Sequence, residues 1–166
     1  LRAISVLKET FREEILTQKL TVIHGDVRKI NVSALGLHRH SYKIIANIPY
    51  YLSGMLFRIF LGNTAQPSDL VFLVQKEVAV RIARDSKESL LSLSVKVFGD
   101  PKYIKTVGKG NFTPQPKIDS AIIAISDISS ERLGLVSADF FFKILHEGFK
   151  SKRKQLLGNL TSLFTR

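Results

Sequence analysis

The 166-residue sequence contains no cysteine, no tryptophan and a single methionine. Without cysteine the chain has no disulfide framework, no thiol nucleophile and no zinc or iron–sulfur site built on thiolates, which fits a cytoplasmic protein. The histidines (His24, His38, His40 and His146) form no HExxH-type helix pair, so we expect no metal site. No run approaches the ~20 uncharged apolar residues of a membrane span, and the N-terminal residues lack the apolar core of a secretory signal.

Acidic residues are scarce in comparison with basic ones. The chain has 25 Lys and Arg against 14 Asp and Glu, which gives a formal net charge of +11. A solvated surface needs no such excess of one sign, so the composition favours an anionic partner. At this level an RNA-facing enzyme, a DNA-binding protein and a membrane-surface protein all remain open, as does a basic surface without a specific partner.

Apolar residues recur with periods that predict alternating strands and helices. Residues 89–100 fit a strand and a helix equally well, and residues 111–120, with prolines two positions apart, predict an extended loop. Strands alternating with helices predict a parallel α/β sheet. The predicted strands are 20–23, 42–46, 69–74, 103–107 and 120–126, and the predicted helices are 1–18, 52–62, 77–84 and most of the last 30 residues, with an N-cap at Ser137.

Polar residues follow three of the predicted strands. They are Gly25 and Asp26, the segment 47–50, and the segment 75–77. Ligands of open α/β sheets bind outside the carboxyl ends of the strands, so these clusters together indicate a binding site. Taken singly, Asp26 also fits a turn or a helix cap, and Glu77 fits the first turn of a helix through the macrodipole.

The segment 47–51 reads NIPYY. The Asn47 amide and a backbone carbonyl near Pro49 offer two acceptors at a spacing that suits the hydrogens of a planar amino group. Tyr50 adds a stacking face, which is worth ~1–3 kcal/mol for a nucleobase. Holding an exocyclic amine by both hydrogens turns its lone pair out of ring conjugation and makes it a better nucleophile. The alternative is a strand-end turn with two half-buried tyrosines.

Two later segments combine cations with features that suit RNA. The loop 111–120 presents Phe112 together with Lys117, an aromatic and a cation that suit base stacking and phosphate contact. A rigid connector with a buried Phe112 is the alternative. The stretch KSKRK (Lys150, Lys152, Arg153 and Lys154) precedes a predicted helix, where cations oppose the macrodipole unless an anion binds. A solvated charged turn is the alternative there.

These segments resemble the ribosomal RNA adenine N6,N6-dimethyltransferases. NIPYYLS is similar to the N-[IL]-P-Y motif of adenine-N6 methyltransferases, and LVQKEVAVRIA, FTPQPKIDSAI and GFKSKRKQLLGNL resemble further segments of the family in the same order. The resemblance implies a Rossmann-like α/β methyltransferase sheet lacking its first strands, in residues 1–128. It also implies a small helical RNA-binding domain in residues 129–166.

The resemblance also implies roles for single residues. Asn47 and the backbone at Pro49 would hold the target amine, with Tyr50 and Phe112 stacked on a flipped adenine. Asp26 and Asn47 would contact the cofactor S-adenosylmethionine. The basic residues named above, with Lys117, would bind RNA.

The implied reaction is dimethylation of two adjacent adenosines near the 3′ end of small-subunit rRNA, by a monomer that acts on a pre-30S-type particle. Large-subunit rRNA adenine methyltransferases share NIPY, and DNA adenine methyltransferases have a similar motif. The loop 111–120 and the basic C-terminal segment argue against the DNA enzymes. A non-catalytic RNA-binding or ribosome-assembly factor is the alternative from another class.

One family feature is missing from the sequence. The family carries a glycine-rich E-x-G-x-G-type loop and an acidic strand end before the segment that Leu1 begins, and no G-x-G precedes NIPYY here. The chain also starts without Met and opens within a predicted helix. We therefore expect a fragment or a reduced relative, with no methylation by these residues alone.

Overall fold

The computed structural model describes residues 2–151, 153 and 155–164. The chain forms two compact units, Leu1–Asn31 and Val32–Arg166, and each is described by itself. The first unit contains α1 (Arg2–Thr10), α2 (Arg12–Leu16) and the 3₁₀ turn η1 (Val27–Lys29). The helix predicted over 1–18 is confirmed in the described residues as two helices with a break at Phe11; helical residues end at Leu16, before Gln18, whose φ is 58°.

The strand predicted at 20–23 is wrong. These residues are irregular, and the described part of the first unit contains helices and turns but no strand. An apolar run becomes a strand only where a neighbouring strand accepts and donates its backbone hydrogen bonds. Within residues 2–31 the apolar run has no such neighbour.

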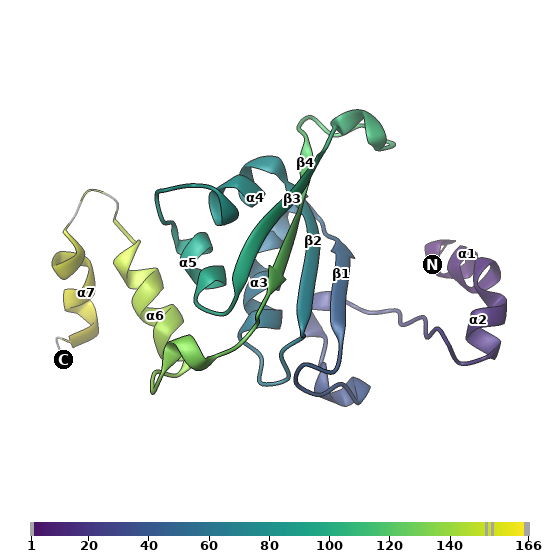
Figure 1. Cartoon of the computed structure of the whole chain (residues 1–166), viewed down its shortest axis with the longest axis horizontal. Helices are drawn as coiled ribbons and strands as arrows, with labels where there is room; N and C mark the ends of the chain where they lie inside the picture. The colour runs from purple at the N-terminus through teal and green to yellow at the C-terminus, as the bar shows by residue number, and fades with distance from the viewer. Residues whose placement is uncertain (1, 152, 154, 165–166) are drawn as a thin grey trace. The chain divides into compact units, whose positions relative to one another are not determined.

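A four-stranded sheet forms the centre of the second unit (Figure 1). Its strands lie in the order β1-β2-β4-β3; β1 and β2 are parallel, whereas β4 runs antiparallel to both β2 and β3. The predicted parallel sheet is therefore correct for the first pair only. A short connection of residues 108–119 joins β3 to β4, and short connections make antiparallel pairs. The bounds are β1 Lys43–Asn47, β2 Asp69–Gln75, β3 Asp100–Val107 and β4 Ser120–Ser126.

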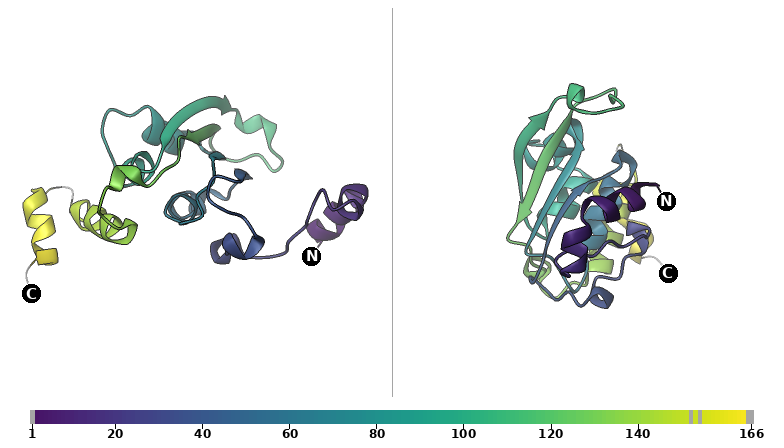
Figure 2. Two further views of the ribbon diagram at one scale, coloured as in Figure 1. Left: turned by 60° about the horizontal axis from the view of Figure 1, so that its bottom comes forward. Right: turned by 90° about the vertical axis from the view of Figure 1, so that its right-hand side faces the viewer.

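Helices α3 (Ser53–Leu61), α4 (Lys76–Ala83) and α5 (Leu90–Lys96) lie against one face of this sheet (Figure 2). Side chains of β2 alternate between buried and half-buried, as a strand covered chiefly on one face requires. The rings of Phe57 in α3 and Phe72 in β2, both fully buried, lie with their centroids 5.1 Å apart. This aromatic core fixes α3, and with it the turn between β1 and α3. Two further 3₁₀ turns, η2 (Ser33–Leu35) and η3 (Tyr50–Leu52), flank β1.

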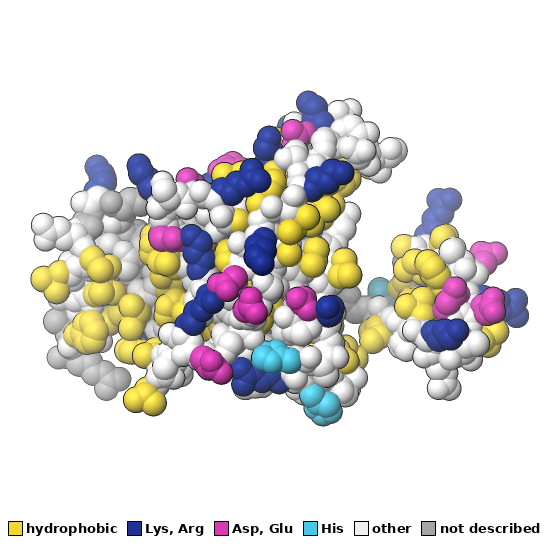
Figure 3. Space-filling model, viewed as in Figure 1, with side chains coloured by type: hydrophobic (Ala, Val, Ile, Leu, Met, Phe, Trp, Pro, Cys, Tyr) yellow, Lys and Arg dark blue, Asp and Glu magenta, His cyan; other side chains and the backbone are white. Residues whose placement is uncertain are grey.

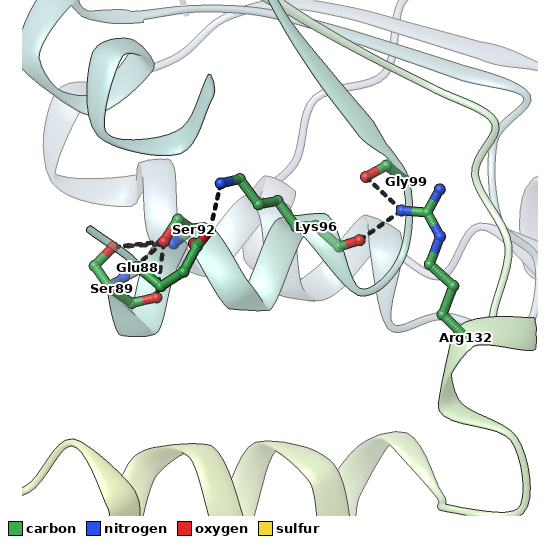
Figure 4. Close-up of polar contacts among 6 residues, drawn as sticks. All are labelled: Glu88, Ser89, Ser92, Lys96, Gly99 and Arg132. Atoms are coloured by element: carbon green, nitrogen blue, oxygen red, sulfur yellow. Dashed lines mark hydrogen bonds and ion pairs between the residues drawn. The ribbon is translucent and has the colours of Figure 1, made fainter. Parts of the chain in front are cut away.

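The segment that fitted both a strand and a helix forms α5, and its N-terminus explains why (Figure 4). The Ser89 hydroxyl accepts from the Ser92 N–H at 3.1 Å, and the Ser92 hydroxyl accepts from the Ser89 N–H at 2.6 Å. This reciprocal capping box satisfies two donors that a strand would leave to a neighbour. At the other end, Arg132 from η5 (Glu131–Leu133) donates to the Lys96 carbonyl at 2.7 Å and the Gly99 carbonyl at 3.2 Å.

The C-terminal part forms α6 (Ala138–Gly148) and α7 (Leu156–Phe164), which confirms the helices predicted there. The Ser137 hydroxyl accepts from the Phe140 N–H, so the predicted N-cap is also confirmed. Phe142 of α6 stacks on Phe98, which follows α5, with centroids 5.7 Å apart. Among the described residues, no helix has the length and apolar character needed to cross a bilayer.

Candidate functional site

Asn47 is the last residue of β1, and it pairs in register with Leu73 two residues before the end of β2. The segments 47–50 and 75–77 therefore lie at the same edge of the sheet, as predicted, whereas the third predicted cluster, Gly25 and Asp26, follows residues that form no strand. The Asn47 side chain is exposed, and its amide makes no hydrogen bond to any residue that the structure describes. Its carbonyl oxygen and amino group are both available to a ligand.

The chain turns sharply after Asn47 into η3. Ile48 is buried and anchors the turn, and the Pro49 carbonyl accepts from the Leu52 N–H at 2.9 Å. A carbonyl oxygen has two lone pairs, so this bond leaves one acceptor position open. Proline fixes φ here at −57°, close to its preferred value, so the turn needs no strain.

Tyr50 is held by a contact that the sequence did not indicate. Its hydroxyl lies 2.8 Å from the hydroxyl of Ser120, the first residue of β4. Ser120 is fully buried, so the bond fixes one end of the tyrosine side chain to the sheet. Tyr51, by contrast, is 83% exposed. The two adjacent tyrosines therefore differ: Tyr50 is oriented by the fold and Tyr51 is free in solvent.

A pocket of about 340 Å³ lies between this turn and the loop 111–120, and we call it the amide pocket. The turn provides the segment 47–50, and the loop provides Phe112, Pro114 and Pro116. Its volume is within the range of small-ligand pockets. The structure thus brings Asn47, Pro49, Tyr50 and Phe112 together across some sixty residues of sequence. Acceptors beside aromatic faces suit a planar heteroaromatic ring that carries an amino group.

Lys117 lines a different pocket. This second pocket, which we call the lysine pocket, has a volume of about 490 Å³. The sequence singled out Lys117 and the segment 75–77, but it gave no reason to join either to Lys109, which follows β3. The lining residues are Lys76, Glu77, Val80, Lys109, Lys117, Ile118 and Asp119.

Asp26 belongs to the first unit and caps η1. Its carboxylate accepts from the Arg28 N–H at 2.9 Å, and the Arg28 guanidinium donates to both carboxylate oxygens. Hydrogen bonds from the Arg28 side chain are the main cause that holds the pKa of Asp26 below its usual value. The structure therefore shows the capping role that was the alternative for this residue.

The basic C-terminal stretch lies between α6 and α7. Lys150 and Arg153 are exposed, and the Lys150 ammonium lies 3.1 Å from the Glu147 carboxylate. Asn159 of α7 donates to the carbonyls of Gly148 at 2.8 Å and Ser151 at 3.0 Å, which ties the start of this stretch to α7. Lys152 and Lys154 lie outside the described residues.

The described residues contain no cluster of three or more His, Asp or Glu side chains with a geometry suited to a metal. The side chains that the structure does bring together at the amide pocket are neutral acceptors and aromatic rings. Such a set recognises organic rings by hydrogen bonds and stacking.

Comparisons with known proteins agree with this fold. The chain is 37% identical over 140 residues to Ribosomal RNA small subunit methyltransferase A of Dehalococcoides mccartyi, covering 84% of this chain and 48% of that protein. It is 32% identical over 163 residues to the protein of the same name from Clostridium botulinum, covering 96% of this chain and 58% of that protein. The chain therefore spans about half the length of these relatives.

Solved structures show the same fold. A dimethyladenosine transferase from Plasmodium falciparum superimposes with a TM-score of 0.75 at 28% identity, over 96% of this chain and 56% of that one. The 23S rRNA methyltransferase ErmE superimposes with a TM-score of 0.69 at 16% identity, over 97% and 63% of the two chains. The expected Rossmann-like methyltransferase fold is confirmed. The model of the family described as Ribosomal RNA adenine dimethylase matches residues 2–166, and the chain belongs to this family.

Proposed function

We propose that this chain is the part of an rRNA adenine N6-methyltransferase that holds the target base. The full reaction in this proposal is dimethylation of two adjacent adenosines near the 3′ end of small-subunit rRNA, with S-adenosylmethionine as methyl donor. The observation that carries it is the amide pocket, which joins Asn47, Pro49 and Tyr50 to Phe112. The names of the bacterial relatives support the substrate class.

Each residue of the amide pocket has a distinct role in this proposal. The Asn47 carbonyl oxygen and a backbone carbonyl at Pro49 accept the two hydrogens of the adenine amine, which turns its lone pair outward. Tyr50 and Phe112 stack on the ring of an adenosine flipped out of its helix. The lone pair of the amine would then face the methyl group that S-adenosylmethionine would supply. The proton of the methylated amine then passes to solvent, so no general base with a shifted pKa is required.

S-adenosylmethionine supplies the electrophilic methyl group when it is bound. Asn47 and Asp26 are the side chains we propose as its contacts. Asn47 fits this role because its amide has no other partner among the described residues. Asp26 fits in part: an ionised carboxylate has about four acceptor positions, and Arg28 occupies most of them.

RNA contacts in this proposal come from cations outside the amide pocket. Lys117 and the basic stretch with Lys150, Lys152, Arg153 and Lys154 would contact phosphates, which fix the register of RNA without reading its sequence. We further propose a sheet domain in residues 1–128 and a helical RNA-binding domain in 129–166. The partner is a pre-30S-type particle in the cytoplasm, on which the protein acts as a monomer.

Asn47→Ala is the experiment that tests the proposed role of the pocket. In a protein where a glycine-rich cofactor loop precedes these residues, the variant should lose methylation of small ribosomal subunits and keep RNA binding. Retained turnover would refute the role of Asn47. We expect no turnover from the 166 residues alone, because no G-x-G precedes Asn47. Methylation of small subunits by this chain without additions would overturn that expectation.

One observation favours a second candidate function. The amide pocket and the exposed Lys117, Lys150 and Arg153 also fit a non-catalytic RNA-binding or ribosome-assembly factor. The gene sequence upstream of Leu1 separates the two: an encoded glycine-rich loop excludes the second candidate.

A further inference from the structure

The lysine pocket is assembled by one residue, Asp119. Its backbone carbonyl accepts from the N–H of Lys76, the first residue of α4, at 3.0 Å. Its carboxylate accepts from the N–H of Lys109, the first residue of the 3₁₀ turn η4 (Lys109–Asn111), also at 3.0 Å. Lys117 lies two residues before Asp119. Asp119 thus hydrogen-bonds to the first residues of α4 and η4, and it lies in the loop that also contains Lys117.

The pocket presents a positive charge that the described protein does not neutralise. All three lysines are exposed, and none of their ammonium groups has an ion pair with a described residue. The lining also has two carboxylates: Glu77 pairs with Arg81, and Asp119 accepts from the backbone N–H of Lys109 and keeps its charge. The three lysines outnumber these carboxylates, so the lining has a net positive charge. Figure 3 shows Lys and Arg side chains gathered over the end of the sheet where β3 leads into β4.

The lysine pocket adjoins the amide pocket along the chain. Pro116 lines the amide pocket and Lys117 lines the lysine pocket, and consecutive Cα atoms are about 3.8 Å apart. On the sheet side, Ser120 contacts Tyr50 and pairs in register with Gln75, the residue before Lys76. The loop 111–120 therefore contributes to both pockets: Phe112, Pro114 and Pro116 line the amide pocket, and Lys117, Ile118 and Asp119 line the lysine pocket.

We propose that the lysine pocket binds a backbone phosphate of a nucleotide that flanks the target adenosine. The proposal rests on the proposed function, because it places RNA in the amide pocket. A base held between Tyr50 and Phe112 brings its own sugar–phosphate chain to the loop, and three ammonium groups complement an anionic oxygen cluster. The lysine pocket then sets which nucleotide of the strand reaches Asn47, whereas it does not recognise the base itself.

The first test compares two variants of equal charge in this chain. K76Q/K109Q/K117Q removes the lysines of the pocket, and K87Q/K102Q/K143Q removes three exposed lysines that have no ion pair among the described residues. Binding of a short fluorescein-labelled RNA with one adenosine among uridines is measured by anisotropy over a range of salt concentrations. The first variant should bind roughly tenfold more weakly and make the negative slope of log K against log[salt] shallower by about 0.7, the value for one phosphate of a single strand. The control should keep the wild-type slope.

The second test locates the phosphate. Neutral methylphosphonate linkages are placed one at a time on each side of the adenosine. One position should weaken binding by the wild-type chain and have no further effect on K76Q/K109Q/K117Q, because the phosphate and the lysines act as a pair. Equal losses for the two triple variants, or the same methylphosphonate losses in both proteins, would overturn the proposal. No RNA binding by the wild-type chain would overturn it as well.

These outcomes are distinguishable from failure of the proposed function. The phosphate site predicts the same fold-loss for the adenosine RNA and for an all-uridine RNA, since phosphates carry no sequence information. The amide pocket predicts discrimination between these two RNAs that is lost in Asn47→Ala. A chain that shows the salt-slope change without discriminating adenosine would keep the lysine pocket and refute the base pocket.

Discussion

The hydrogen bond between Tyr50 and Ser120 orients one wall of the amide pocket. The two hydroxyls lie 2.8 Å apart, and Ser120 is fully buried. Tyr50→Phe keeps the aromatic ring but leaves the Ser120 hydroxyl buried without this partner. The cost of such a loss is about 1–3 kcal/mol in the free energy of unfolding. Tyr50→Phe should therefore destabilise the chain, although the residue lies at a half-buried surface turn.

Urea unfolding of a double-mutant cycle measures this effect. Ser120→Ala removes the other hydroxyl, and the Tyr50 hydroxyl can then turn to water because the tyrosine is only half-buried. We expect the coupling between the two substitutions to equal most of this cost of about 1–3 kcal/mol, so that Tyr50→Phe costs little in the Ser120→Ala background. Additive losses would show that the contact does not hold the ring. Tyr50→Phe should still bind adenosine RNA, because the stacking face remains.

Three further predictions test the fold with four other substitutions. Asn159→Ala removes two hydrogen bonds to carbonyls between α6 and α7, and it should lower the free energy of unfolding by about 1–3 kcal/mol in urea titrations; an unchanged midpoint would refute the role of Asn159. Gly99→Ala places a Cβ 2.8 Å from the Ser126 carbonyl oxygen of β4 and should lower the free energy of unfolding by about 1–3 kcal/mol. Gly158→Ala lies in a helix, where its Cβ would have no contact within 4 Å, and it should be neutral or stabilising. Equal effects of the two substitutions would contradict this packing. Hydrogen bonding from Lys96 holds the pKa of Glu88 below its usual value, so the ion pair stabilises the fold above the unfolded pKa and the contribution is lost as pH falls through the folded pKa. Glu88→Gln should therefore reduce the loss of stability on acidification measured by urea unfolding at neutral and acidic pH, and an unchanged pH profile would refute this assignment.

The sequence predicted the α/β fold and the meeting of two polar segments at one edge of the sheet, but it did not predict the direction of every strand. The segments 47–50 and 75–77 end parallel strands, and parallel strands in one sheet place their ends together, so their meeting followed from topology alone. Phe112 lines the amide pocket with residues 47–50, and it lies in the proline-containing loop 111–120 that was predicted to be extended. The antiparallel direction of β4 differs from the predicted parallel sheet. The connection 108–119 between β3 and β4 contains no crossover α-helix, and such a short connection joins antiparallel strands.

Other features depended on partners that a single segment does not reveal. The apolar run 20–23 has the composition of a strand, but pairing decides whether a strand forms. Residues 89–100 were ambiguous because both periods fit, and the Ser89 capping box settled the outcome locally. Lys109 gave no signal at all, because its place in the lysine pocket comes from a hydrogen bond to Asp119, ten residues away.

The central claim is that Asn47 holds the amine of a target adenine in the amide pocket. The measurement that tests it most directly compares binding of this chain to two short RNAs, one with a single adenosine and one with purine riboside, which lacks the amine, at the same position. The wild-type chain should bind the adenosine RNA about tenfold more tightly, the value of one or two hydrogen bonds to the amine, and Asn47→Ala should lose the share of this preference that the Asn47 side chain provides. Equal binding of the two RNAs by the wild-type chain, or an undiminished preference in Asn47→Ala, would contradict the account.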